Sequence, residues 1–145
     1  MDIMHELTIH SPVSAVWQAT LDLESLPDLS PTLTWLERLD SGPIEVGSAA
    51  RLKQPGQRAK VWTVTTVRPE ELFEWETTIA GVRTVATHRL AAVEGGCRNT
   101  LVLTLHGRGA GLLRFLAGRS MRAALAKENA GFKRKAEATA RASHD

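Results

Sequence analysis

The chain is predicted to form one α+β domain, in which a curved antiparallel sheet of about seven strands wraps around a long C-terminal helix. Between residues 32 and 106, short runs rich in Val, Thr and Trp are separated by tight turns, which is typical of an antiparallel meander. From residue 112 to about 140 there is no proline, and apolar residues recur at helical spacing. A helix of that length spans about 40 Å. It must lie across the sheet to bury its apolar stripe.

Size and composition fit a single globular domain. The chain has 145 residues, of which 43% are hydrophobic and 23% charged, and this is enough for one core. We expect residues 1–140 to form that domain and residues 141–145 to be a frayed tail. No run is long enough to span a bilayer, the N-terminus lacks the pattern of a signal peptide, and Cys97 is the single cysteine. A cytoplasmic protein is therefore expected.

The N-terminal part is predicted to hold a strand and two short helices. Apolar and polar side chains alternate along Ile3–Ile9, as in a strand with one buried face. Ser11 and Pro12 have the character of an N-cap and a first helical residue, and the helix is expected to run to about Leu23. Because residues 26–31 contain two prolines, they can hold at most one further helical turn.

The middle of the chain is predicted to be a series of strands. Each run ends at a turn signal, of which Gln54-Pro55-Gly56 and Glu94-Gly95-Gly96 are examples. The expected strands are 32–39, 49–53, 59–67, 72–79, 82–93 and 98–106. Three glycines in residues 107–111 end the last strand. The long helix comes next, with one stripe made by Leu113, Ala117, Met121, Ala124, Leu125, Glu128 and Phe132.

A series of short motifs occurs in the same order as these elements. They are Ile9-His10-Ser11-Pro12 before Val16-Trp17, Pro27-Asp28-Leu29-Ser30-Pro31, Val61-Trp62-Thr63-Val64-Thr65, Phe73-Glu74-Trp75, Thr87-His88-Arg89-Leu90 and Ala130-Gly131-Phe132-Lys133-Arg134-Lys135-Ala136-Glu137. In order and spacing they resemble the START-like superfamily, also called SRPBCC or helix-grip proteins, and within it the polyketide cyclase/dehydrase group. The resemblance covers nearly the whole chain, although Leu29 stands where the family has a tryptophan.

The resemblance implies a cavity between the long helix and the concave face of the sheet. It does not imply one activity, because a shared fold hosts many functions. Strand alternation and helical spacing predict the lining as Trp35, Trp62, Phe73, Trp75, Thr84, His88, Leu101, Leu103, Met121, Leu125 and Phe132. This apolar set predicts binding of a small hydrophobic molecule, such as a lipid, an isoprenoid or an aromatic polyketide. Plain core packing is the alternative for each tryptophan.

His88 is the titratable residue that alternation places on the concave face. An imidazole there can act as a general acid or base, so the alternative function is an enzyme of the polyketide cyclase or dehydratase type. The opposing interpretation is a core histidine bonded to Thr84 or to a backbone carbonyl, since we see no inward carboxylate at a spacing that would orient the ring. Whether the protein is an enzyme stays open at this point. His5 raises the same question on its own strand.

Charge is unevenly placed along the chain. The net charge is +2, but residues 108–141 hold nine basic and two acidic residues, so this segment carries +7 and the remainder −5. A solvated helix face accounts for such a run. The alternative is contact with nucleic acid or a membrane surface through Arg114, Arg119, Arg122 and Lys127. The histidines are scattered, so neither a metal nor a cofactor is expected. The oligomeric state is left open.

Overall fold

The computed structural model describes residues 1–142, in which seven antiparallel strands form one sheet in the order β1-β7-β6-β5-β4-β3-β2. The strands are β1 (Asp2–Ile9), β2 (Trp35–Arg38), β3 (Ala49–Lys53), β4 (Lys60–Arg68), β5 (Leu72–Ile79), β6 (Val82–Val93) and β7 (Gly96–His106). The helices are α1 (Val13–Leu21), α2 (Leu26–Leu29) and α3 (Ala110–Ala142), with a 3-10 turn η1 at Leu23–Ser25. The predicted fold class is confirmed. Of the predicted tail, residues 143–145 lie outside the described residues.

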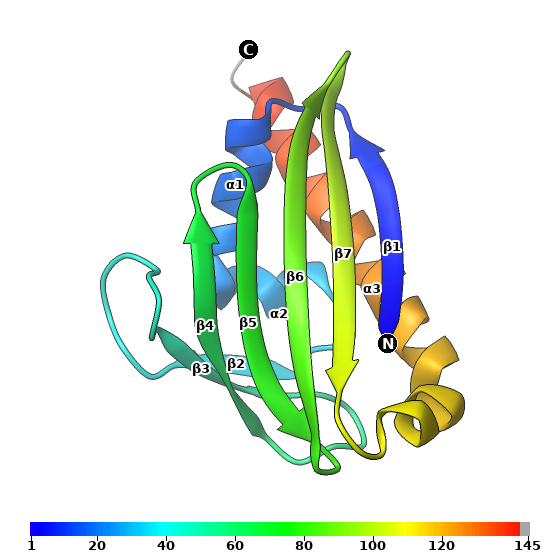
Figure 1. Ribbon diagram of the computed structural model, residues 1–145. Coiled ribbons are helices and arrows are strands. Elements are labelled where there is room, and N and C mark those ends of the chain that lie inside the picture. The colour runs from blue at the N-terminus through cyan, green and yellow to red at the C-terminus, as the bar shows by residue number, and fades with distance from the viewer. Residues whose placement is uncertain (143–145) are drawn as a thin grey trace.

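The sheet and α3 form two layers (Figure 1). α3 runs behind the sheet and packs against β1, β7 and α1. On the same side α1 also contacts β6 and β7, while η1 and α2 lie near β2. α3 has 33 residues, and its first turns lie outside the β1 edge of the sheet, at the lower right of this view. No helix within residues 1–142 has the length and apolar character needed to cross a bilayer.

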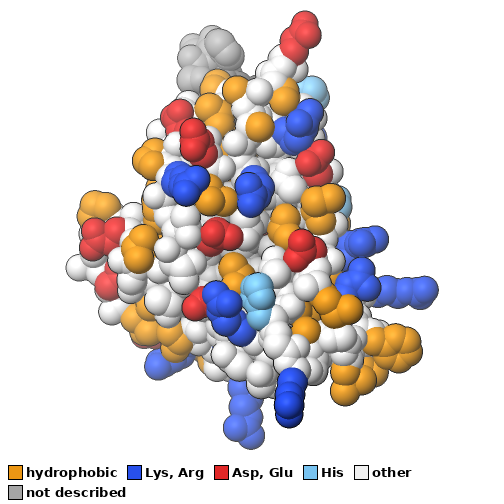
Figure 2. All heavy atoms as spheres, viewed as in Figure 1, with side chains coloured by type: hydrophobic (Ala, Val, Ile, Leu, Met, Phe, Trp, Pro, Cys, Tyr) orange, Lys and Arg blue, Asp and Glu red, His pale blue; other side chains and the backbone are white. Residues whose placement is uncertain are grey.

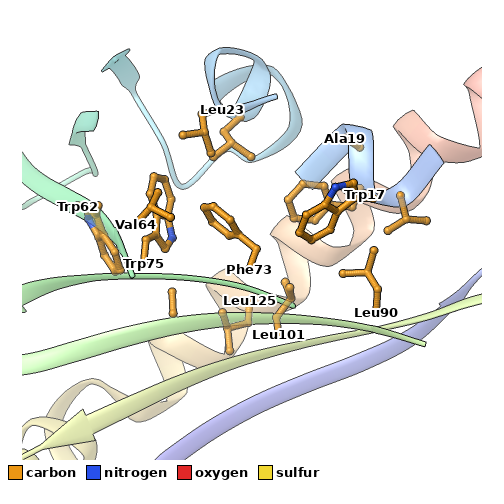
Figure 3. Close-up of a cluster of buried hydrophobic side chains, with 14 of the residues drawn as sticks. Trp17, Ala19, Leu23, Trp62, Val64, Phe73, Trp75, Leu90, Leu101 and Leu125 are labelled. Carbon is orange, nitrogen blue, oxygen red and sulfur yellow. The ribbon is translucent and has the colours of Figure 1, made fainter. Parts of the chain in front are cut away.

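Register places the predicted inward side chains beside one another. Ala86 of β6 is opposite Leu103 of β7 and Trp75 of β5, and His88 is opposite Leu101 and Phe73. Cross-strand partners point to the same face, so these side chains form the concave floor. The predicted alternation of β6 and β7 is confirmed. Figure 3 shows Trp62, Trp75 and Phe73 in a row along this floor.

A β-bulge in β4 explains why its alternation is ambiguous in the sequence. Trp62 and Val64 are buried and Val61 is 41% exposed, which fixes the inward face of the first half of the strand. The register against β5 shifts between Val64 and Thr66. An extra residue reverses the facing of the second half of the strand, and Val67 then packs against the core as well.

The C-terminal half of α3 is tied to the short helices by polar contacts. Ser11 does not cap α1, because Pro12 holds the N-cap position. The Ser11 hydroxyl instead donates a hydrogen bond of 3.1 Å to the carbonyl of Ala136 in α3. Other ties are Arg134 to the Leu29 carbonyl at 3.2 Å and Lys135 to Asp22 at 2.7 Å.

A buried amide pair joins α3 to the sheet. Asn129 of α3 and Asn99 of β7 are both 0% exposed, and the Asn99 amide donates to the Asn129 side-chain oxygen at 2.9 Å. The Asn129 amide donates to Nδ1 of His5 at 3.0 Å and to the Asn99 carbonyl at 3.2 Å. His5 therefore has a structural partner. A buried hydrogen-bond network of this kind fixes the position of a helix on a sheet, although the side-chain oxygen of Asn99 has no partner among the described residues.

Cys97 lies at the start of β7, opposite Ile9 of β1 and Ala92 of β6. Its side chain is 0% exposed, and the thiol is free. Burial raises the pKa of this thiol above its ordinary value, so little thiolate forms at neutral pH.

Candidate functional site

A cavity of about 170 Å³ lies between the concave floor of the sheet and α3. Its wall is mostly apolar, with Leu, Ile, Ala, Met and Trp side chains from β3 to β7, α2 and α3. Two of the lining residues, Gln57 and Ser120, are exposed to solvent. The cavity therefore opens between the β3–β4 turn and the N-terminal half of α3.

Most of the predicted site residues meet around this cavity. The lining includes Trp62, Trp75, His88, Leu101, Leu103, Met121 and Leu125. The indole N–H of Trp62 is buried and has no hydrogen-bond acceptor among the described residues. The structure adds apolar neighbours that alternation did not single out, including Leu26, Leu52, Ile79 and Ala86.

Trp35 lies away from the cavity. Its side chain is 39% exposed, whereas Leu36, the next residue, packs against the core. The inward face predicted for Trp35 is wrong. A strand over 32–39 would place Trp35 on the same face as Leu33 and Leu39, but β2 is only four residues long. Leu33 lies before this strand, and Leu39 lies after it and is 44% exposed. The alternation of side chains along β2 therefore does not extend to either residue.

Phe73, Thr84 and Phe132 are buried but form a second layer behind the lining. The Phe73 and Phe132 rings meet the His88 imidazole edge-on, with centroids 5.5 and 5.7 Å from it. The Thr84 hydroxyl donates to the carbonyl of Val82 at 3.2 Å. The two aromatic residues fix the orientation of His88 by packing, because a ring wedged between two aromatic rings has little room to turn.

His88 is held in an apolar setting without the expected partner. It is 5% exposed, and its Nδ1 atom is buried with no hydrogen bond to any described residue. Neither Thr84 nor a backbone carbonyl fills that role. Burial lowers the pKa of His88 from its ordinary 6.5 to about 4, because an imidazolium loses its hydration there. At neutral pH the ring is therefore uncharged.

Glu128 of α3 faces His88 across the cavity, and the expectation of no inward carboxylate is wrong. Glu128 Oε1 lies 3.9 Å from His88 Nε2, and Glu128 lines the cavity. Burial raises the pKa of its carboxyl from 4.5 to about 7. The signal was present in the sequence, since Glu128 occupies the apolar stripe of the helix between Leu125 and Phe132.

The two groups do not form an ion pair at neutral pH. Opposite charges at 3.9 Å attract, but the cost of removing both from water dominates each pKa. The separation also exceeds hydrogen-bond length. The cavity thus presents a neutral imidazole and a partly protonated carboxyl, which is one proton acceptor facing one proton donor.

The described residues contain no cluster of three or more His, Cys, Asp or Glu side chains able to hold a metal ion. The site as it stands is therefore an apolar cavity with one acid–base pair on its wall.

Comparison with solved structures supports this architecture. TTHA0849 from Thermus thermophilus is 19% identical with a TM-score of 0.76, and the match covers 96% of this chain and 99% of that one. The KanY protein is 20% identical at a TM-score of 0.75, covering 94% and 97%. The di-domain ARO/CYC StfQ of the steffimycin biosynthetic pathway is 12% identical at a TM-score of 0.77, covering 96% and 51%. At these identities the likeness shows the fold alone.

Sequence comparison gives the family. No curated protein matches the chain at a significant level. The family described as Polyketide cyclase / dehydrase and lipid transport matches residues 2–137, nearly the whole chain. The chain has the helix-grip fold expected from its motifs and belongs to this polyketide cyclase/dehydrase and lipid transport family.

Proposed function

We propose that the protein binds a small hydrophobic molecule of the lipid, isoprenoid or aromatic polyketide class in the cavity between the sheet and α3. The observation that carries the proposal is the apolar cavity of about 170 Å³. An apolar cavity of about 150 Å³ accommodates a benzene-sized guest. Burial of apolar ligand surface supplies affinity at about 25 cal/mol per Å².

With its single cysteine unable to form an internal disulfide, the protein is assigned to the cytoplasm in this proposal.

The volume separates the ligand classes by size. A one-ring aromatic or a short branched chain fits the cavity as it stands. A polycyclic polyketide or a long acyl chain requires the N-terminal half of α3 to move outward or the ligand to project through the mouth. The side chains of Leu113, Ala117 and Met121 are only half-buried, so this half of α3 has the lower cost of displacement.

Native mass spectrometry of the purified full chain, followed by organic extraction, tests the binding function. Ala86→Leu fills the cavity from β6 and is expected to remove a hydrophobic adduct or to weaken its binding by at least about tenfold. The matched control is Ala91→Leu, the same change on an exposed position of the same strand. Circular dichroism checks that both variants fold.

Tryptophan fluorescence gives the second readout, because Trp62 and Trp75 line the cavity. A one-ring phenol and a short isoprenoid alcohol serve as probes. The proposal fails if no adduct is extracted and neither probe quenches the fluorescence of the folded wild-type protein.

Proton transfer within the same cavity is the second candidate function, favoured by the pairing of His88 with Glu128. In a dehydration, neutral His88 removes a proton from carbon while protonated Glu128 gives its proton to the departing hydroxyl group, which leaves as water. The rate then needs His88 unprotonated and Glu128 protonated. The expected pH profile is bell-shaped, with limbs near pH about 4 and about 7.

His88→Ala separates the two functions. A binding protein keeps its ligand when the imidazole is removed, whereas an enzyme keeps the ligand and loses turnover. Glu128→Gln retains the size of the side chain but removes the proton donor. It is therefore expected to lower turnover and to remove the upper limb of the pH profile. Turnover unaffected by either substitution contradicts the enzymatic candidate and leaves the binding function standing.

A further inference from the structure

The first turns of α3 are apolar on two opposite sides. The inner side carries Leu113 and Met121, which pack toward the core. The outer side carries three large apolar side chains at i, i+3 and i+4, namely Leu112, Phe115 and Leu116, which are 63%, 85% and 71% exposed. Nothing in the described residues covers them. We call these three residues the outer stripe.

Basic residues predominate in the part of the chain that carries the outer stripe. Residues 107–127 contain Arg108, Arg114, Arg119, Arg122 and Lys127, and no acidic residue. None of the five forms an ion pair within residues 1–142. Arg119 and Arg122 continue the line of the outer stripe one turn further along the helix. Figure 2 shows hydrophobic side chains gathered over the start of α3, with basic side chains projecting beside them.

We propose that the outer stripe docks the protein on the surface of an anionic lipid bilayer. Leu112, Phe115 and Leu116 would enter the boundary between headgroups and acyl chains, and the arginines would contact lipid phosphates. Cationic side chains beside an apolar helix face are suited to this interface, because the apolar side chains leave water while the cationic ones stay among the anionic headgroups. The docking is peripheral, since the helix is not apolar enough to cross the bilayer.

Charge and chemistry favour a membrane over other partners. A nucleic acid would satisfy the arginines, but its phosphates offer nothing to Leu112 and Leu116, which are more than half exposed. A second copy docked through the same face would bring five basic side chains against five with no acidic residue between them. An anionic bilayer matches both the apolar side chains and the charge.

Docking in this way places the cavity entrance about one helix diameter from the lipid surface. Ala117, Ser120 and Met121 line the cavity from the same turns of α3 that carry the outer stripe on their other side. A hydrophobic molecule leaving the bilayer would therefore reach the mouth without a long passage through water. The docking surface itself does not depend on what the cavity holds.

Vesicle flotation of the full chain tests the proposal. We expect binding to vesicles of phosphatidylcholine and phosphatidylglycerol in equal parts, and weak binding to phosphatidylcholine alone. Phe115→Ser is expected to lower the partition coefficient about tenfold. Val46→Ser is the matched control, because Val46 is 65% exposed but belongs to the loop before β3.

Charge variants supply the second arm. Arg119→Gln with Arg122→Gln is expected to reduce binding to the anionic vesicles, whereas Arg51→Gln with Arg89→Gln, exposed arginines of the sheet, removes the same charge with little effect. Equal losses in both pairs would show attraction by net charge only and would overturn the proposal. Three other results would also overturn the proposal. The first is an unchanged partition coefficient in Phe115→Ser, and the second is binding to single-stranded RNA in place of vesicles. The third is a dimer in sedimentation velocity that Phe115→Ser dissociates.

Discussion

At the scale of single residues, the wall of the cavity holds two groups whose charged forms are both suppressed. The edges of Phe73 and Phe132 exclude water from the His88 ring, and Glu128 approaches from α3 at 3.9 Å. The ordinary pKa values are 4.5 for the carboxyl and 6.5 for the imidazole. At a pH between these two values, the folded protein has an unprotonated imidazole and a protonated carboxyl. In the unfolded state the proton is on the imidazole instead. Both states hold one proton on the pair.

Because the folded and unfolded states hold the same number of protons on this pair, His88 and Glu128 together should give wild type no pH dependence of stability in this range. Folding depends on pH only where the two states bind different numbers of protons. In wild type the contributions of His88 and Glu128 cancel between pH 4.5 and 6.5. Glu128→Gln leaves His88 alone, whose pKa falls on folding from 6.5 to about 4, so the free energy of unfolding should rise between those pH values. His88→Asn leaves Glu128 alone, whose pKa rises from 4.5 to about 7, so stability should fall across that window.

Urea unfolding at a series of pH values measures the effect. Each slope, taken relative to wild type, should amount to roughly 2 kcal/mol across its window, because one proton corresponds to about 1.4 kcal/mol per pH unit and local relaxation reduces the full value. Slopes of the same sign in the two variants, or none, would contradict the assignment of a neutral pair.

The sequence locates half of this pair and misses the other half for a physical reason. Alternation along β6 suffices to point His88 inward, because every second residue of a strand shares a face. Glu128 also falls on the apolar stripe of α3. Which residue of α3 stands opposite His88 depends on how far the helix is shifted along the sheet. That shift is set by the Asn129–Asn99 bonds and the contact of Gly131 with α2, and no sequence period encodes it.

At the scale of elements, long regular segments are predicted well and short or interrupted ones poorly. β6 and β7, with 12 and 11 residues, have unambiguous faces. β2 has four residues, so a period cannot be established, and Trp35 is assigned to the wrong face. β4 is interrupted by its bulge, so a single alternation cannot describe both of its halves.

Two glycines within α3 should respond in opposite ways to the same substitution. Alanine in a helix interior is favoured over glycine by up to about 1 kcal/mol. At Gly118 an added Cβ meets only the flexible Arg114 side chain, at 3.6 Å, so Gly118→Ala should stabilise the protein. At Gly131 the added Cβ would overlap the backbone carbonyl of Leu29. Gly131→Ala should therefore destabilise it, by about 1–3 kcal/mol.

Thermal and urea unfolding of the two variants check this prediction. Because both changes lie in one helix, helix propensity is matched and the difference reports the close approach of α2. If Gly131→Ala is as stable as Gly118→Ala, α2 does not rest on α3 at this point.

At the scale of the whole molecule, α3 has a fixed half and a loose half. From Leu125 to Ala136 its inward side chains are largely buried, and polar ties join it to β1, β7, α1 and α2. Before Leu125 the inward side chains are only half-buried, and the cavity lies beneath them. The sequence predicts one continuous helix, since its stripe runs through both halves. It does not predict the change in packing, because the space left below the helix depends on the depth of the sheet.

Hydrogen exchange should resolve the two halves. Amides of residues 113–121 are expected to exchange faster than those of residues 128–136, because local opening costs less where fewer apolar contacts are lost. A ligand in the cavity should slow exchange in the first set and leave the second nearly unchanged. Uniform protection along α3 would show that the helix opens as a single unit.

The free thiol at the start of β7 is a reporter that the protein carries already. Cys97 is sealed between β1 and β6, so a thiol reagent in excess reacts only after the strands separate there, and the labelling rate then reports that separation. The same seal has a practical value. A cysteine introduced on the surface will react far sooner than Cys97, so a spectroscopic probe can be attached at one chosen position with the native residue left in place.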